Sequence, residues 1–435
     1  MIKIKVSFLF LFLFLLILLS SCLNKPAGKT TTIEPTPTPI LTPTPTPSPT
    51  TTTTTIEPTA LSVICTELAT YNSNGLDSSK ILQSCIDRTP KGEKLFLPKG
   101  KFILVNEVII NKAMTLTTSG STNDKCSADE NHDCAELKAN AETMTKIGFV
   151  KVLSDNVFFD HIVINGNRQE RYQSLAADKC KLSADNNIYG QNVQFLGNDI
   201  KITNSVFKNA LCGTGLYLIS GARFNVINNT ITSNGVHDKN LLWSDGLTAL
   251  EISNSIISDN LFSDNTDIDL ILGACPACTI KSNLITHTNS FTSSSFAGLM
   301  IQAWPNGGTS GNYTGANIYN NTINCSQGQR CGFGIYLGSS AWYDANVYGG
   351  NVHDNSVFGA QQGFAVDKVK DFSIANNQVS GSQGTFQTSC GPKYFSAFVI
   401  TPGTIVNRQN DLIPSFHYLS FKLDGCIPND SKFPY

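Results

Sequence analysis

The sequence has few charged residues and no excess of either sign. Charged residues make up 15% of the 435 residues, and 31 Lys and Arg against 33 Asp and Glu leave a formal net charge of −2. A protein that binds nucleic acid needs clustered Lys and Arg, and one that adheres to anionic lipid needs a polybasic segment. The composition therefore predicts neither a nucleic-acid partner nor electrostatic binding to a membrane surface.

An apolar run long enough to cross a membrane is also missing near the N-terminus. The run from Phe8 to Leu19 is shorter than the roughly 20 residues that a spanning helix needs. A basic start precedes it and Leu19-Ser20-Ser21-Cys22 follows it, which is the order of an export signal. Leu-Ser-Ser-Cys resembles the bacterial lipobox, and the resemblance implies cleavage before Cys22 and lipidation of its thiol. An ordinary signal peptide or an uncleaved anchor is the alternative.

Residues 1–21 are therefore predicted to be a lipoprotein signal peptide, and residues 22–60 a disordered linker. The linker is rich in Thr and Pro, so it cannot bury a core and is expected to be extended as polyproline II. At about 3.1 Å per residue it could hold a domain roughly 100 Å from the lipid. We expect a protein anchored by lipid alone in the bacterial cell envelope, at the outer membrane or cell surface.

The cysteines favour an oxidising compartment. Of 13 cysteines, twelve remain once Cys22 is set aside, and an even number in an exported chain favours disulfides. The near neighbours in sequence suggest six bridges, although spacing does not fix connectivity: Cys65–Cys85, Cys126–Cys134, Cys180–Cys212, Cys275–Cys278, Cys325–Cys331 and Cys390–Cys426. Cys275-Pro276-Ala277-Cys278 also has the form of a redox or zinc motif, which stays an alternative to a disulfide.

Asn is unusually common, with about forty residues, and it recurs in regular phrases. A helical protein has little use for so much Asn, because its side chain competes for local backbone hydrogen bonds. One Asn per phrase serves as an anchor, followed within two residues by an apolar β-former: Asn204, Asn229, Asn260, Asn283, Asn321, Asn355 and Asn377. Fourteen residues before five of these anchors lie Gly190, Gly215, Gly246, Asp269 and Gly363. For Asn321 and Asn355 the equivalent glycines are Gly298 and Gly334, so those two repeats carry insertions.

This repeat predicts a solenoid of short strands. Apolar runs such as Leu216-Tyr217-Leu218 and Leu270-Ile271-Leu272 follow the glycine or aspartate positions, and the spacing leaves no room for helices between them. Stacking one such unit on the next gives a parallel β-helix, an all-β fold with Leu, Ile and Val inside. Asn at the bends can form side-chain ladders between coils.

Residues 146–384 resemble the right-handed parallel β-helix proteins of the pectate lyase and polygalacturonase-like superfamily. Residues 71–120 resemble the entry segment of that superfamily, and we expect residues 61–145 to form the N-terminal cap and entry segment. There Gly75-Leu76-Asp77 caps a short helix with an apolar face at Ile81, Leu82, Cys85 and Ile86. Leu95–Phe102 and Ile164–Asn167 are similar to its characteristic strand and turn. Residues 385–435 are then a C-terminal cap. The resemblance implies the fold and not the chemistry, since such solenoids host many functions.

Three aspartates form the favoured candidate site. If Leu216 and Leu218 face inward, strand alternation places Asp269 and Asp267 on the outer face, about 6.6 Å apart at the backbone. Asp245 belongs to the stacked coil about 4.8 Å away. Close carboxylates either hold a cation such as Ca²⁺ or divide into an acid and a base, and both serve the chemistry of acidic glycans. The alternative is that all three side chains cap turns and backbone amides.

His237 lies in the loop before Asp245 and could assist as a general base, or it could simply be solvated. Asn265-Thr266-Asp267 is similar to a phrase of the polygalacturonase-like hydrolases. The Gly-His-Gly that accompanies it in that family is missing from this chain, so that family's mechanism does not transfer directly. His287 follows an anchor Asn and is expected to be structural.

Aromatic residues at the strand flanks suit stacking on sugar rings. The flank candidates are Trp243, Trp304 and Trp342, and strand alternation also places Tyr217 and Tyr336 on the outer face. Packing of loops onto the solenoid is the alternative. The acidic loop 124–136 is a second candidate Ca²⁺ site or a solvated loop. The sequence thus predicts a monomeric surface lipoprotein that binds and processes a polysaccharide as a hydrolase, lyase or epimerase. A non-catalytic adhesin or envelope protein with the same rigid face is the alternative.

Overall fold

The computed structural model describes residues 62–381 apart from 73–74, 144, 146–147, 175–189, 237–241, 306–307, 327–329 and 340–344. Beyond residue 381 it describes the backbone of five short strands. The predicted signal peptide, lipidated Cys22 and the linker lie outside the described residues. The predicted segment boundaries stay predictions.

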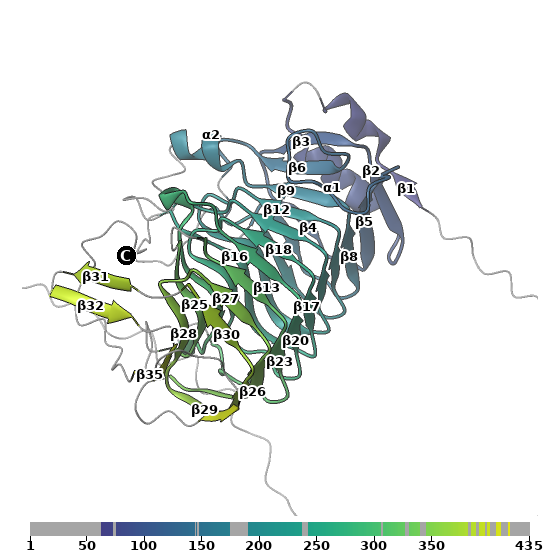
Figure 1. Ribbon diagram of the computed structural model, residues 1–435. Coiled ribbons are helices and arrows are strands. Elements are labelled where there is room, and N and C mark those ends of the chain that lie inside the picture. Colours follow the sequence, from purple (N-terminus) through teal and green to yellow (C-terminus); the bar gives the residue numbers. More distant parts are fainter. Residues whose placement is uncertain are drawn as a thin grey trace, which may run out of the picture. The chain divides into compact units, whose positions relative to one another are not determined.

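The described chain winds through three parallel sheets, and each turn of the chain adds one strand to each sheet (Figure 1). Sheet A is 12-stranded and contains β1 (Val63–Ile64), β2 (Lys94–Leu97), β5 (Met114–Thr118), β8 (Val157–Asp160), β11 (Lys201–Thr203), β14 (Asn225–Ile227), β17 (Ile256–Ser258), β20 (Thr279–Lys281), β23 (Asn317–Tyr319), β26 (Val347–His353), β29 (Val369–Ala375) and β34 (Val406–Gln409). Sheet B is 10-stranded and contains β3 (Gly100–Leu104), β6 (Ala135–Ala139), β9 (Ile162–Asn165), β12 (Val206–Lys208), β15 (Thr230–Thr232), β18 (Leu261–Ser263), β21 (Leu284–Thr286), β24 (Thr322–Asn324), β27 (Ser356–Phe358) and β30 (Gln378–Ser380).

Sheet C is 11-stranded and carries the candidate site. It contains β4 (Val108–Ile110), β7 (Val150–Val152), β10 (Val193–Leu196), β13 (Gly213–Ala222), β16 (Ser244–Ser253), β19 (Ile268–Leu272), β22 (Ser295–Ile301), β25 (Cys331–Leu337), β28 (Gln362–Val366), β33 (Phe398–Ile400) and β35 (Phe416–His417). The hairpin of β31 (Gly384–Thr388) and β32 (Gly391–Phe395) is antiparallel and separate. The predicted parallel β-helix is confirmed.

The strands form because apolar residues recur in register from coil to coil. Leu216 pairs with Leu247, which pairs with Leu270, and the same column continues through Leu299, Ile335 and Phe364. All six side chains are buried in one continuous core that runs along the solenoid. The register confirms that Gly298 and Gly334 are the equivalents of Gly246 despite the insertions.

The predicted asparagine ladder is present at the turn from sheet A to sheet B. In each of five steps, Nδ2 of one Asn donates to Oδ1 of the next at 2.9–3.0 Å, and the same Oδ1 accepts the backbone N–H of the donor residue. The ladder runs through Asn229, Asn260, Asn283, Asn321, Asn355 and Asn377. Stacking buried amides in this way satisfies donors and acceptors that the core cannot.

The strand register shows that two residues of the first predicted repeat, Asn204 and Gly190, were assigned to the wrong positions. Ser205, not Asn204, occupies the ladder position, since its backbone N–H donates to Asn229 Oδ1 at 3.0 Å. Asn204 instead occupies the preceding left-handed position, with φ of 54°. Asn tolerates that conformation, so both turn positions attract Asn for different reasons. Similarly Val193 pairs with Leu216, which places Asn192 rather than Gly190 beside Gly215.

The N-terminal cap contains the predicted helix, α1 (Ser79–Arg88). Asp77 Oδ1 accepts the N–H of Ser79 at 2.9 Å, and Leu82, Cys85 and Ile86 are buried as expected. The other helices are short: α2 (Arg168–Gln173), η1 (Thr66–Thr70) and η2 (Phe291–Ser293). Within the described residues, no helix has the length and apolar character to span a bilayer.

Four of the six predicted disulfides are present. They are Cys65–Cys85, Cys126–Cys134, Cys275–Cys278 and Cys325–Cys331. Cys212 is also disulfide-bonded, while Cys180, Cys390 and Cys426 lie outside the described residues. The Cys-x-x-Cys motif is therefore a buried disulfide in the wall of the solenoid rather than a thiolate site.

Candidate functional site: a pair of carboxyl groups on sheet C

Asp245 and Asp267 come together where two adjacent strands of sheet C begin. Asp245 is the second residue of β16, and Asp267 immediately precedes β19. The N–H of Asp267 donates to Ser244 O at 3.1 Å, and the N–H of Ile268 donates to Asp245 Oδ1 at 3.2 Å. The start of one strand thus fixes the start of the next, which holds the two carboxyl groups on neighbouring coils.

Both carboxyl groups are difficult to ionise. Burial raises the pKa of Asp245 well above its usual value, and the charge of Asp267 raises it further. Bonds to Asp245 from the Thr248 hydroxyl, at 2.7 Å, and from the Ile268 N–H lower that pKa only in part. Burial raises the pKa of Asp267 to about 6. Burial and the neighbouring charge therefore oppose ionisation of both groups at once, and they oppose that of Asp245 most strongly.

The pair faces outward, beside Tyr217. Tyr217 pairs directly with Thr248 across β13 and β16, and its side chain is half-buried. Burial, followed by the negative charge of Asp245, raises the pKa of Tyr217. Asp245 is 9% exposed and Asp267 is half-buried, so the pair is accessible without being fully solvated. Trp243, directly before β16, is half-buried as well.

The prediction that Asp269 lies on the same exposed face is wrong. Asp269 is fully buried, and its carboxylate accepts Asn265 Nδ2 at 2.9 Å and contacts His287 Nε2 at 2.7 Å. The strand departs from simple alternation here, because Ile268 and Ile271 both belong to a cluster outside the main core. Asp269 occupies the register position of Gly246 and Gly298, and side chains at that position point inward. A Cβ on Gly298, for example, would lie 2.7 Å from Cγ2 of the buried Ile323.

His287 is structural, as expected. Its Nδ1 lies 2.7 Å from Ser293 O, and its Nε2 faces both Asp269 and, at 3.1 Å, Ser295 Oγ. Burial lowers its pKa, but the charge and hydrogen bond of Asp269 outweigh this, so the pKa is raised overall. A catalytic triad uses the two ring nitrogens for different partners, whereas one nitrogen serves both here, and all three side chains are buried.

Of the predicted sugar-binding aromatic residues, Tyr217 and Trp243 lie near the carboxyl pair, and Trp304 and Tyr336 belong to or pack against an outer apolar cluster. This outer apolar cluster consists of Ile268, Ile271, Phe296, Ala297, Met300, Phe333, Tyr336 and Ala365, with Trp304 half-buried against it. The prediction that Tyr336 is an exposed sugar-binding residue is wrong: it is fully buried, and its hydroxyl donates to Asp367 Oδ2 at 3.3 Å. His237 and Trp342 lie outside the described residues.

Two residues near the pair were not found by sequence reasoning. The Thr248 hydroxyl donates to Asp245, three residues earlier in β16. In a regular strand two residues at this spacing face opposite sides, so the contact shows that the strand is irregular between them. Arg168, at the start of α2, donates from Nη1 to Gly235 O, and a Cβ on Gly235 would lie 2.4 Å from Ser244 N. Arg168 is thus a cation beside the strand that carries Asp245. No short-range signal connects it to a residue so far along the chain.

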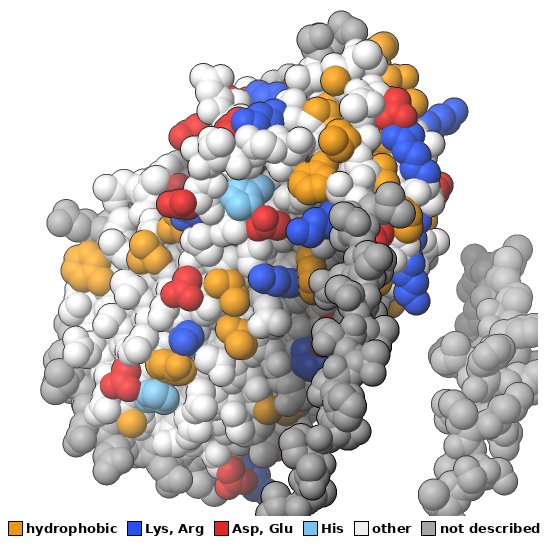
Figure 2. Space-filling view, turned by 90° about the vertical axis from the view of Figure 1, so that its right-hand side faces the viewer, with side chains coloured by type: hydrophobic (Ala, Val, Ile, Leu, Met, Phe, Trp, Pro, Cys, Tyr) orange, Lys and Arg blue, Asp and Glu red, His pale blue; other side chains and the backbone are white. Residues whose placement is uncertain are grey.

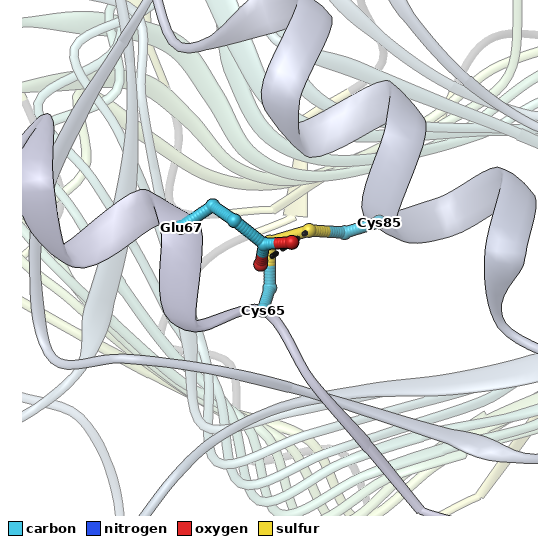
Figure 3. A group of neighbouring side chains, drawn as sticks. All are labelled: Cys65, Glu67 and Cys85. Carbon is cyan, nitrogen blue, oxygen red and sulfur yellow. Dashed lines mark hydrogen bonds between the residues drawn. A yellow bond between two sulfur atoms is a disulfide. The ribbon is translucent and has the colours of Figure 1, made fainter.

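Among the described residues, one set of three metal-ligand side chains converges, and it is not the aspartates. It consists of Cys65, Glu67 and Cys85 (Figure 3). The two sulfurs are joined in a disulfide, which leaves no thiolate to hold a metal. Glu67 is paired with Arg88 at 2.6 Å, and this bond lowers the pKa of Glu67. The cluster closes the N-terminal cap.

The acidic loop 124–136 is held by basic side chains of the protein. Glu130 pairs with Lys101 at 2.5 Å, and Asp133 pairs with Lys99 at 2.5 Å. Glu136 is fully buried between His132 at 2.7 Å and Asn165 Nδ2 at 2.6 Å. These partners account for the carboxylates of Glu130, Asp133 and Glu136.

Comparisons with known proteins agree with this architecture. A family model described as the right handed beta helix region matches residues 160–302. The Agl-KA catalytic domain superposes with a TM-score of 0.53 and 14% identity over 84% of this chain and 68% of its own. The hyperthermoactive exopolygalacturonase from Thermotoga maritima superposes with a TM-score of 0.53 and 14% identity, over 82% of this chain and 90% of its own. The polygalacturonase from Erwinia carotovora ssp. carotovora superposes with a TM-score of 0.51 and 12% identity, over 85% of this chain and 100% of its own.

A search of curated proteins finds no match. At 12–14% identity the structural similarity establishes the fold and leaves the chemistry to the site. The three parallel sheets, the coil-to-coil register and the family-model match together establish the fold of the described chain as a right-handed parallel β-helix.

Proposed function

We propose that this protein binds a polysaccharide and cleaves its glycosidic bonds by general acid–base catalysis, with Asp245 and Asp267 as the reacting carboxyl groups. The observation that carries the proposal is the meeting of these two residues on adjacent coils, at an accessible edge of a rigid sheet. Glycoside hydrolysis requires one protonated carboxyl group at the leaving oxygen and one ionised group on the other side of the sugar.

The two environments suggest separate roles. Asp245 is the more buried and the harder to ionise, so it is suited to hold the proton as the general acid. Asp267, with a pKa raised to about 6, is ionised at neutral pH and acts as base or nucleophile. Thr248 positions Asp245 through its hydroxyl, and the ring of Tyr217 offers a surface for the sugar.

The similarity of the fold to that of two polygalacturonases supports a polysaccharide as substrate. An acidic polymer is a natural first choice for the test. The face in Figure 2 intersperses Lys and Arg with Asp and Glu, with single hydrophobic side chains between them, so that face offers no uniformly basic surface for nucleic acid.

A panel of polysaccharides tests the proposal. The purified protein is incubated with acidic and neutral polymers, and both new reducing ends and unsaturated uronates are measured. Reducing ends without unsaturation support hydrolysis, and unsaturated products would instead assign a lyase. Retained binding without turnover on every polymer would overturn the catalytic proposal in favour of a carbohydrate-binding adhesin.

We further propose that the mature protein is a lipoprotein of the bacterial cell envelope, tethered through Cys22 and the Thr/Pro-rich linker. The support is the Leu-Ser-Ser-Cys motif behind a short apolar run. Two or more acyl chains give stable anchoring where one does not. In cells, Cys22→Ala is expected to move the protein from the membrane fraction to the soluble fraction and to abolish incorporation of labelled palmitate. Unchanged fractionation and labelling would refute the anchor.

A further inference from the structure

A cavity of about 710 Å³ lies at the opposite end of the sheet C strands from the carboxyl pair. Its lining combines Ala303, Pro305, Asn346, Tyr348, Lys370 and Asp371. This volume lies within the range of small-ligand sites, and the mixture of an aromatic ring, aliphatic groups and a few polar side chains is typical of them. Nothing in the catalytic proposal uses these residues.

The segment between β22 and β23 builds one wall of the cavity. It contains the insertion predicted from the repeat and is fixed at several points. Thr309 N–H donates to Trp304 O at 3.1 Å, and Ser310 N–H donates to Glu251 Oε1. Gly311 has φ of 68°, and a Cβ there would lie 2.6 Å from Asn346 O, so only glycine lets the two segments approach this closely. Residues 309–311 of the wall are therefore held in place by the rest of the solenoid.

The floor comes from two paired strands of sheet A. Tyr348 in β26 lies directly opposite Lys370 in β29, and their backbone neighbours Val347 and Val369 are buried. Tyr348 keeps 37% of its surface exposed, while its N–H donates to Gly311 O at 3.0 Å. Lys370 and Asp371 are exposed, and neither forms an ion pair with another described residue. An aromatic ring thus stands beside a cation and a carboxylate that have no partner in the described chain.

We propose that this cavity is a second, non-catalytic carbohydrate site that binds a pyranose unit. The apolar face of the sugar packs on Tyr348, Lys370 donates to ring hydroxyls, and Asp371 accepts from them. A pair of groups, one donating and one accepting, suits vicinal hydroxyls, whereas a purely anionic or purely apolar ligand would leave one group unused.

The two sites are connected by one strand. Asp245 lies near the start of β16, and Glu251, six residues later, binds the cavity wall through Ser310. At about 3.3 Å per residue the separation along the strand is roughly 20 Å. A polymer of several sugars could occupy both sites at once, so its second contact would be intramolecular and its apparent affinity higher than that of a short oligosaccharide.

Calorimetric titration with trisaccharides and hexasaccharides, in galacturonic acid and neutral glucose series, tests the proposal. It is performed on the full chain carrying Asp267→Asn, so that no sugar is consumed. Adding Tyr348→Ala is expected to raise the dissociation constant of one class of binding sites about tenfold or more. Asp371→Asn and Lys370→Gln are expected to weaken it to a smaller extent. Phe158→Ala is the matched control, since Phe158 is a 40% exposed aromatic residue elsewhere on sheet A.

The outcomes separate this proposal from the proposed catalysis. Binding that depends on Tyr348 in a protein without turnover on any polymer supports the cavity and refutes the hydrolase. The cavity proposal alone is overturned if the wild-type protein turns over a polymer while, in the Asp267→Asn background, Tyr348→Ala, Asp371→Asn and Lys370→Gln bind every sugar like the Phe158→Ala control. Asp371→Asn and Lys370→Gln change exposed side chains and should leave the fold intact, so they still test the cavity if Tyr348→Ala is poorly folded. A preference between the two sugar series identifies the polymer.

Discussion

Asp267 and Asp269 are two residues apart on one coil, yet they occupy opposite environments. Asp269 is fully buried and has a complete set of partners in Asn265 and His287. Asp267 is half-buried, and its carboxyl group forms no ion pair with any described residue and stands beside a second acid, Asp245. The fold thus supplies hydrogen-bond partners to the Asp269 carboxylate, whereas it places the Asp267 carboxyl group where ionisation is unfavourable.

The difference indicates which aspartate is available for chemistry. A buried acid with satisfied partners stabilises the fold and has no reason to exchange its proton. An acid whose ionisation is opposed by burial and by a like charge lowers stability, and such residues cluster at functional sites. The same substitution, Asp→Asn, should therefore have opposite consequences at the two positions.

The largest expected effect is on turnover. Asp267→Asn removes the ionisable carboxyl group and keeps the side-chain size, so kcat on the polymer identified by the panel should fall about 100- to 10,000-fold. Reducing-end kinetics measure this. Asp259→Asn is the matched control, since Asp259 is an exposed turn residue at which Asn is equally compatible with φ of 58°. Equal activity of the Asp267 and Asp259 variants would remove Asp267 from the mechanism.

The next largest effect is on the stability of the solenoid. Asp269→Asn takes the negative charge away from His287, so the imidazole loses the main partner that favours its charged form while burial still opposes its ionisation. Breaking a buried ion pair in this way should lower the free energy of unfolding by about 3 kcal/mol. Chemical denaturation followed by circular dichroism measures it. If Asp269→Asn unfolds at the same denaturant concentration as wild type, the bond to His287 is not a stabilising pair.

The sequence predicted the solenoid well because periodicity is a property of many residues at once. Errors at Asn204 and Gly190 did not affect the register of the later coils. The site was harder to predict, because it depends on one local bend. Strict alternation places Asp267 and Asp269 on the same side, and the bend at the glycine positions turns Asp269 into the solenoid. Tyr336 was misplaced for a different reason, since sequence alone does not show that the outer face is covered there.

The pH dependence of stability sharpens the comparison with a smaller effect. The unfolded chain releases the Asp267 proton near pH 4, whereas the folded protein keeps it until about pH 6. The folded state thus binds more protons in this window, and stability falls as the pH rises from about 4 through 6. Asp267→Asn should remove the contribution of Asp267 to this slope and raise the free energy of unfolding at pH 7 by roughly 2 to 3 kcal/mol. The part of the slope that comes from the buried Asp245 should remain.

The His287 site should behave differently in the same denaturation series. Its folded pKa is raised, so its contribution is fully present below pH 6.5 and is lost as the pH rises through the folded value. Wild type and Asp267→Asn should share this alkaline loss, and Asp269→Asn should lack it. An acidic slope of unchanged size in Asp267→Asn would show that Asp267 does not contribute to it.

The smallest effect distinguishes the two tyrosines that the sequence placed on one face. Tyr336→Phe removes a buried hydroxyl from Asp367, which should cost about 1 kcal/mol of stability and leave kcat/KM unchanged. Tyr217→Phe removes a hydroxyl beside Asp245 and should lower kcat/KM about fivefold with little change in the unfolding midpoint. The reverse pattern, with Tyr336→Phe impairing turnover and Tyr217→Phe only the fold, would place the substrate over the outer apolar cluster instead of over the carboxyl pair.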